Sequence, residues 1–234
     1  GVADLQTVCP ASPSIEPFPE QAKNLVEVLK WHVQQQPERV HLRLLGDEGE
    51  EQSLSYGQLW LGAQKVAAGL QSHGILPGEA VVIMLPSGVD YFFSFYGILL
   101  AGAIPVPIYP PARSSQIEQH LHRHCGILNN CRAKALITVK KAKIIAQLLK
   151  SQVLSLQYIF TLSNLTATEQ LYRQPLIGAD DIALLQYTSG STGHPKGVIL
   201  SHASLLTNIR LMGRAIKADG NDVFVSWLPL YHDM

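Results

Sequence analysis

The sequence is poor in cysteine, has no surplus of charge of either sign and contains no long unbroken hydrophobic run. Its three cysteines, Cys9, Cys125 and Cys131, are too few and too unevenly spaced for a disulfide framework, which favours a reducing, cytoplasmic setting. Basic and acidic residues number 18 each, so neither a nucleic-acid partner nor an anionic membrane is expected. The first residues lack the basic and apolar segments of a signal peptide.

Residues 91–112 contain no charged residue, so this stretch has to be weighed as a membrane span. It is interrupted by Gly97, Gly102, Pro105, Pro107, Pro110 and Pro111. Its helical part is therefore well short of the ~20 residues that a spanning helix requires. We expect a buried helix followed by a buried strand, and no transmembrane segment.

Strand-like and helix-like segments alternate along the chain. Ala80–Leu85 is an unbroken apolar run, typical of a parallel strand that is covered on both faces. Further strands are expected at Ile104–Ile108, Ala135–Val139 and Leu156–Phe160, with helices between them. This order predicts an α/β fold, doubly wound, with mostly parallel sheets and helices on both faces. Residues 1–19 are rich in proline and lack periodicity, which predicts an extended lead-in.

Serines stand where several helices should begin. Ser55 and Gln58 form a capping-box pattern, and Ser201 precedes another helix. Ser87 is expected to cap a helix from about Val89 to Ala101.

Two later segments have weaker patterns. The stretch from Thr161 to Ala179 is polar, which predicts a surface connection. Val223–Leu228 is apolar, and we interpret it as a strand whose end carries Tyr231, His232 and Asp233.

Nitrogen and sulfur side chains gather at His120, His122, His124, Cys125 and Cys131. His120 and His124 share a helical face, so a metal site is one interpretation. Helical spacing also links Ile117, Leu121, Cys125 and Leu128. This second pattern favours an inward apolar stripe that includes Cys125, with the histidines facing outward. No second ligand pair stands at zinc-like spacing, so the structural interpretation is preferred.

The stretch from Tyr187 to Val198 is the chemically most distinctive part of the sequence. It follows an apolar run, Ile182–Leu185, that predicts a buried strand, and it is dominated by glycine, serine and threonine. Glycines let backbone N–H groups point into one concavity, hydroxyls add donors, and Lys196 adds positive charge, a combination that suits a polyphosphate. A Walker phosphate loop is excluded, because Pro195 precedes the lysine and Gly197 follows it.

The same residues carry a family resemblance. Thr188–Gly197 reads Thr-Ser-Gly-Ser-Thr-Gly-His-Pro-Lys-Gly, and it resembles the signature loop of the adenylate-forming superfamily. That superfamily includes acyl-CoA synthetases, peptide-synthetase adenylation domains, luciferases and fatty acyl-AMP ligases. Ile108–Arg113, Leu184–Tyr187 and Ser226–Met234 are most similar to the fatty acyl-AMP ligase branch. The resemblance covers about residues 20–234, which look like the N-terminal portion of a large adenylation domain, incomplete at its C-terminus.

The resemblance implies an enzyme that uses ATP and Mg²⁺ to join a fatty acid to AMP, with release of pyrophosphate. The acyl group would then pass to the phosphopantetheine thiol of an acyl carrier protein, in the same or another polypeptide, for lipid or polyketide biosynthesis. His232 and Lys196 are the implied catalytic residues, and Thr188 is the implied metal ligand. The implied nucleotide-binding residues are Thr188, Ser189, Gly190, Ser191, Thr192, Gly193 and Lys196.

Two alternatives remain open. An acyl-CoA synthetase would share the first step and differ in its acceptor thiol, and a truncated chain could serve only as a nucleotide- or partner-binding module. Much of the implied active site, including the adenine pocket, would follow Met234. We therefore expect the isolated chain to form no acyl-adenylate.

Overall fold

Four parallel strands form the central sheet of the structure, a computed structural model that describes residues 18–46, 49–110, 117–188 and 195–231. They are β3 (Ala80–Met84), β4 (Ile104–Pro107), β5 (Ala135–Thr138) and β6 (Tyr158–Phe160), in the order β4-β3-β5-β6. Each pairing within this sheet is parallel. The predicted strands and their direction are confirmed.

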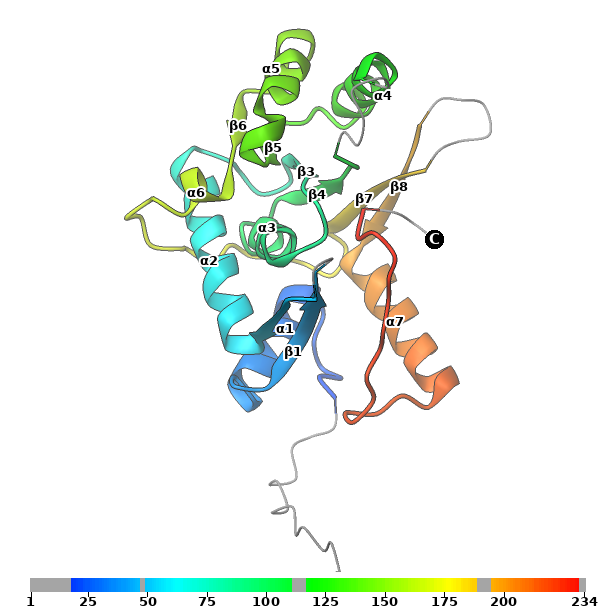
Figure 1. The fold of residues 1–234 in the computed structure, drawn as a ribbon. Coiled ribbons are helices and arrows are strands. Elements are labelled where there is room, and N and C mark those ends of the chain that lie inside the picture. Colours follow the sequence, from blue (N-terminus) through cyan, green and yellow to red (C-terminus); the bar gives the residue numbers. More distant parts are fainter. Residues whose placement is uncertain (1–17, 47–48, 111–116, 189–194, 232–234) are drawn as a thin grey trace, which may run out of the picture.

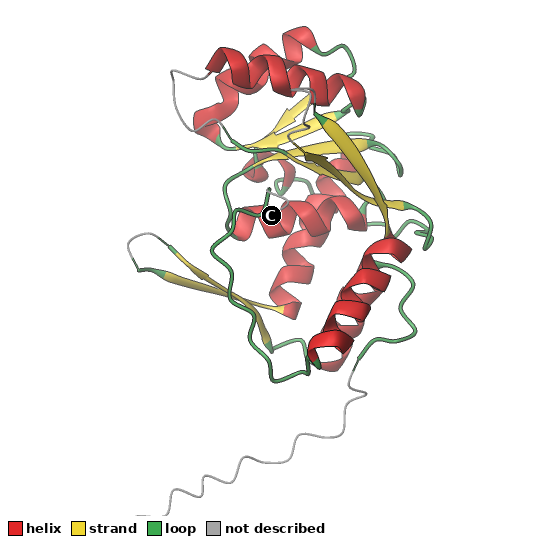
Figure 2. Cartoon of the chain, turned by 90° about the vertical axis from the view of Figure 1, so that its right-hand side faces the viewer, coloured by secondary structure: helices red, strands yellow, loops and turns green. Residues whose placement is uncertain are grey.

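Helices cover both faces of this sheet (Figures 1 and 2). Successive side chains of a strand point to opposite faces, so Val81 and Ile83 enter one core while Val82 and Met84 enter another. The helices over the first core are α2 (Tyr56–Ser72) and α3 (Val89–Leu100); those over the second are α4 (Ile117–Asn130) and α5 (Lys143–Gln152), which follows a 3₁₀ turn at Lys140–Ala142. The doubly wound α/β fold is confirmed.

The uncharged stretch forms α3 and then β4, whose four residues are all buried. Among the helices in the described ranges, none is both long and apolar enough to cross a membrane. The expected buried helix and buried strand are confirmed.

The N-terminal part packs beside this core. Helix α1 (Leu25–Gln35) contacts α2 and α3, and β1 (Val40–Leu45) pairs antiparallel with β2 (Glu51–Ser55). The capping box of Ser55 and Gln58 is present at the start of α2, as predicted.

The prediction that Ser87 caps α3 is wrong. Gly88 is the N-cap of that helix and makes no side-chain hydrogen bond. The Ser87 hydroxyl oxygen instead accepts a hydrogen bond from the Leu230 amide at 3.1 Å, and the Tyr91 hydroxyl donates to the Leu230 carbonyl at 2.9 Å. The start of α3 therefore holds both polar groups of one distant residue, a contact that local sequence cannot reveal.

The connection from Thr161 to Ala179 is more than a surface loop, which corrects its prediction. It begins with a helical turn, α6 (Leu162–Leu165), whose Leu165 is completely buried. Farther on, the Tyr172 hydroxyl donates to the Leu100 carbonyl at 3.2 Å. These contacts hold the segment against α2 and α3. They are too far apart in the sequence to give a periodic hydrophobic pattern.

The last strands form a separate antiparallel pair, β7 (Ile182–Thr188) and β8 (Lys196–Ser201), followed by α7 (His202–Ile216). Ser201 caps α7, as predicted, by accepting a hydrogen bond from the Ser204 amide. Strand β7 is only partly buried, with Ala183 and Tyr187 as its buried residues, so the prediction of a buried strand is only partly correct.

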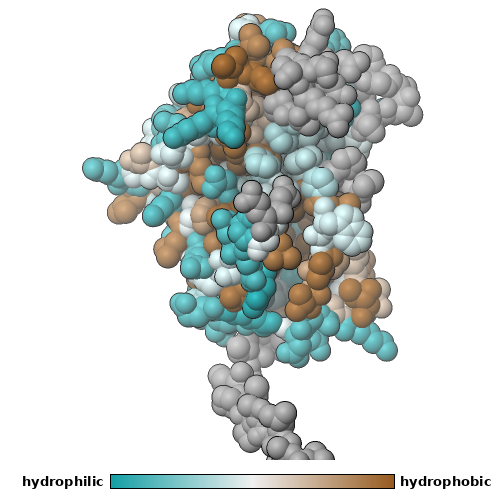
Figure 3. Space-filling view, in the orientation of Figure 1, coloured by the Kyte–Doolittle hydropathy of each residue, from teal (hydrophilic) through white to brown (hydrophobic). Residues whose placement is uncertain are grey.

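Residues 218–231 follow α7 and form neither a helix nor a strand, so the strand expected at Val223–Leu228 is absent from the described chain. The side chains of residues 223–227 are exposed, including Phe224 at 90% and Trp227 at 89%. Figure 3 shows apolar side chains on this side of the molecule. An extended apolar segment becomes a strand only where another strand pairs with it.

Candidate functional site

The β7–β8 hairpin brings together the two ends of the glycine- and serine-rich loop. Thr188 lies opposite Lys196 in the register of the hairpin, Thr188 is half-buried, and Lys196 is exposed. Of the predicted site residues, Ser189, Gly190, Ser191, Thr192, Gly193 and His232 lie outside the described residues. The sequence predicts a buried strand before this loop; in the structure that strand, β7, pairs antiparallel with β8 and packs beside β4.

The ring of Tyr187 explains why the last residue of the signature is a glycine. Gly197 pairs with Tyr187 across the hairpin, and a β-carbon at Gly197 would lie 2.9 Å from the Tyr187 Cζ atom. Real Cβ atoms avoid so short a distance, so any larger residue would push the ring out of place.

Tyr187 also fastens β7 to the sheet-covering helix α4. Its hydroxyl donates to Oδ1 of Asn130, the last residue of α4. Burial raises the pKa of Tyr187 to about 12, so the hydroxyl stays protonated and can donate. The position of the hairpin is thus tied to α4.

Helix α4 matches the sequence-based prediction only in part. His124 is fully buried and His120 is 5% exposed, so the outward direction predicted for these two histidines is wrong, whereas His122 is exposed, as predicted. Cys125 is half-buried and packs against the second core, in agreement with the predicted inward stripe. A second set of residues at helical spacing is 120, 124, 127 and 131, and both Ile127 and Leu128 pack into the second core. Residues of both stripes contact this core, so spacing alone could not decide how wide the buried face of α4 is.

Burial of these imidazoles lowers their pKa values. The pKa of His120 falls to about 4, and that of His124 to about 3, where the neighbouring His120 and Arg123 add to the effect of burial. Both rings are therefore neutral near pH 7, with one N–H donor and one acceptor nitrogen each.

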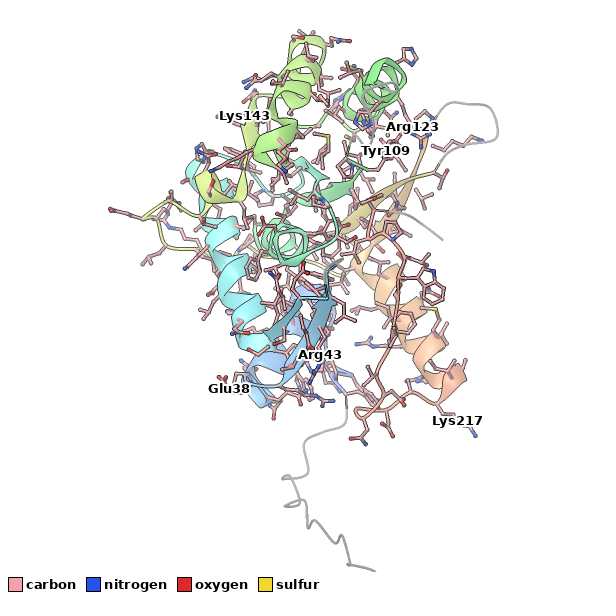
Figure 4. The ribbon with its side chains drawn as sticks, viewed as in Figure 1. Glu38, Arg43, Tyr109, Arg123, Lys143 and Lys217 are labelled. Atoms are coloured by element: carbon pink, nitrogen blue, oxygen red, sulfur yellow. The ribbon has the colours of Figure 1, made fainter. Side chains whose placement is uncertain are left out.

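Two residues missed by the sequence-based site prediction complete this cluster. The Tyr109 ring centroid lies 5.2 Å from that of His120 and 4.7 Å from that of His124, and the two imidazole centroids are 3.9 Å apart. The Arg123 guanidinium lies over the Tyr109 ring, 5.7 Å from its centroid, and these two side chains lie together near the ends of the hairpin in Figure 4. We call Tyr109, His120, Arg123 and His124 the α4 cluster.

Arg123 connects the α4 cluster to the loop. Its Nη2 donates to the Thr188 carbonyl over 3.5 Å, a long contact at the last described residue before the loop. The signal that could have revealed this link is the His-x-x-Arg-His spacing, which places His120, Arg123 and His124 on neighbouring positions of one helix.

The described residues give limited support to a metal site. They contain no group of three or more histidine, cysteine, aspartate or glutamate side chains that could hold a metal ion. Mg²⁺ takes about six oxygen ligands, and the predicted site offers one of them, the Thr188 hydroxyl. The donor set therefore fits Mg²⁺ only if nucleotide phosphates and water provide most of the coordination.

A family model described as AMP-binding enzyme matches residues 29–234. Similar proteins include long-chain-fatty-acid–AMP ligase FadD32 of Mycobacterium marinum, 30% identical over 93% of this chain and 35% of the relative. Medium-chain-fatty-acid–[acyl-carrier-protein] ligase JamA of Moorena producens is 29% identical over 89% and 36%. 4-Coumarate–CoA ligase 1 of Petroselinum crispum is 33% identical over 80% and 35%. The chain thus spans about a third of the length of these curated relatives.

Solved structures give the same fold. A fatty acyl-adenylate ligase from L. pneumophila, in complex with acyl adenylate and pyrophosphate, superposes with a TM-score of 0.79 and 32% identity. The match covers 92% of this chain and 36% of that chain. Its fold and sequence similarity confirm the predicted resemblance to fatty acyl-AMP ligases.

Proposed function

We propose that this chain, which belongs to the AMP-binding enzyme family, is the part of a fatty acyl-AMP ligase that grips the phosphates of ATP. The observation that carries the proposal is the hairpin that sets Thr188 opposite Lys196, with the glycine, serine and threonine residues between them. It is supported by the similarity to the L. pneumophila ligase, whose solved complex contains acyl adenylate and pyrophosphate.

The proposed reaction is attack of a fatty acid carboxylate oxygen on the α-phosphorus of ATP, which forms acyl-adenylate and releases pyrophosphate. A carboxylate is already ionised near neutral pH, so the reaction requires no strong general base. The protein has to align the reacting groups and offset the phosphate charge.

Each site residue has a proposed part in that task. The exposed ammonium of Lys196 would pair with phosphate oxygens, and backbone and hydroxyl donors of Ser189–Gly193 would surround them. The Thr188 hydroxyl would be one ligand of Mg²⁺, which supplies further positive charge when bound. His232 would lie near the α-phosphate and the acyl carboxylate.

The second proposed step transfers the acyl group to the phosphopantetheine thiol of an acyl carrier protein, in a cytoplasmic pathway of lipid or polyketide synthesis. The name of the Moorena relative, an acyl-carrier-protein ligase, supports this acceptor. CoA is the second candidate acceptor, supported by the 4-coumarate–CoA ligase match at 33% identity.

The test is fatty-acid-dependent ATP–pyrophosphate exchange. We propose that the 234-residue chain alone shows no exchange and that a longer protein that contains it is active. In that longer protein the acyl acceptor is either a carrier protein or CoA. In that longer protein, Lys196→Ala should lower kcat/KM for ATP by about 100-fold, the scale for losing one charged transition-state contact. Lys143→Ala, on α5 and far from the hairpin in Figure 4, is the matched control. Unchanged kcat/KM in Lys196→Ala would remove the assigned role.

Robust exchange by the isolated chain would contradict the proposed division of the active site. Binding of ATP or carrier protein to the isolated chain, combined with no activity in the longer protein, would favour the alternative of a binding module. Calorimetry with each ligand makes this distinction.

A further inference from the structure

The α4 cluster contains buried polar atoms without partners. In the described part of the chain, His120 Nε2, both ring nitrogens of His124 and Arg123 Nε are buried and make no hydrogen bond. A buried polar atom without a partner destabilises the folded chain, so several in one place indicate a site that a ligand completes.

The chemistry of these atoms favours an anion over a metal cation. Arg123 offers only donors and a permanent positive charge, and each neutral imidazole adds one N–H donor. The ion pairs found among the described residues are Arg43–Glu51 and Lys134–Glu79, so no described carboxylate neutralises Arg123. A cation would be repelled by this guanidinium, whereas a group with several acceptor oxygens would satisfy the donors together.

The position of the α4 cluster indicates which class of anion it binds. Arg123 reaches the carbonyl of Thr188, and the next residue begins the loop that the proposed function assigns to phosphates. We propose that the α4 cluster is a second phosphoryl-binding site beside Thr188, which takes oxygens of the pyrophosphate half of ATP. This inference rests on the proposed function and adds Arg123, His120 and His124 as binding residues.

Tyr109 supplies the entrance. It is 37% exposed while the imidazoles that it touches are buried, so its ring forms the solvent side of the cluster. The single 3.5 Å contact to Thr188 is a weak restraint on Arg123. Rotation of Tyr109 and movement of Arg123 would expose the ring nitrogens to a phosphate and let the guanidinium turn onto it.

The test is to titrate the 234-residue chain with sodium pyrophosphate and to measure binding by isothermal titration calorimetry. Arg123→Gln should weaken binding at least tenfold and His124→Leu at least threefold. Arg43→Gln, an exposed arginine on β1 at the other end of the molecule in Figure 4, should leave binding unchanged. Thermal melting of each variant checks that it is folded. On the parent chain, the ring signals of His120 and His124 should shift in NMR spectra during the titration, a readout that needs no variant.

Several outcomes overturn the inference. These are no pyrophosphate binding by the parent chain, unchanged binding in Arg123→Gln, or histidine signals that do not move. Equally tight binding of sulfate or octanoate would refute a phosphoryl site, and tighter binding of 4′-phosphopantetheine would assign it to the acceptor instead of the nucleotide. If Lys196→Ala abolishes exchange in the longer protein while Arg123→Gln has no effect there or here, this inference fails and the proposed function survives.

Discussion

Gly197 and Tyr187 face each other across the β7–β8 hairpin so closely that no side chain fits between them. The last glycine of the signature thus has a structural task, because it makes room for the ring that ties β7 to α4. A phosphate-binding loop needs such a fixed base, since its donors act only when held in place.

Replacing this glycine should destabilise the hairpin. Gly197→Ala should lower the free energy of unfolding by about 1–3 kcal/mol, the usual cost of overpacking, because the new methyl group displaces the Tyr187 ring. Urea unfolding measures the change. Val198→Ala, at the adjacent and 42% exposed position, should cost clearly less, and equal losses in the two variants would contradict the close contact.

Removing the tyrosine hydroxyl tests the anchor to α4. Tyr187→Phe loses the hydrogen bond to Asn130 and should cost about 0.5–1.5 kcal/mol. A double-mutant cycle with Asn130→Ala measures the pair directly by urea unfolding. A coupling energy of zero would show that the two side chains do not interact in solution.

The buried histidines should make stability depend on pH. Their pKa values lie near 4 and 3 in the folded chain and return to about 6.5 on unfolding, so the unfolded state binds more protons below that pH. Their stabilising contribution is present above pH 6.5 and is lost as pH falls towards 4, by up to about 1.4 kcal/mol per pKa unit.

Replacing one histidine isolates this effect. His124→Leu should flatten the fall in unfolding free energy between pH 6.5 and 4, measured by urea unfolding at each pH. His122→Leu, at an exposed position on the same helix, should keep the parent slope. An unchanged slope in His124→Leu would mean that the imidazole is not buried in solution.

Two helical glycines should respond oppositely to alanine. An ideal β-carbon at Gly69 would lie 2.2 Å from the Leu165 carbonyl oxygen, so Gly69→Ala forces α2 and α6 apart. Gly126 has no atom within 4 Å of that position, and Gly126→Ala should stabilise α4 by about 0.5–1 kcal/mol. Thermal melts should move in opposite directions; a higher melting temperature for Gly69→Ala would contradict this packing.

Local sequence determined much of this protein. The unbroken apolar run that became β3, the capping box at Ser55 and the alternation of strand and helix predicted an α/β fold with parallel strands, because each signal arises from neighbours in the chain. The signature beginning at Thr188 likewise indicated the family.

Tertiary structure decided what periodicity leaves open. Helix α4 carries two stripes at helical spacing, and the folded chain buries His120 and His124 of one stripe together with Leu128 of the other. Strand β7 pairs antiparallel with β8, which makes a hairpin, and the Ser87 hydroxyl accepts a hydrogen bond from the distant Leu230 amide instead of capping α3. Spacing fixes which residues share a face, whereas the direction of that face, and the partner of each polar group, follow from what the folded chain brings against it.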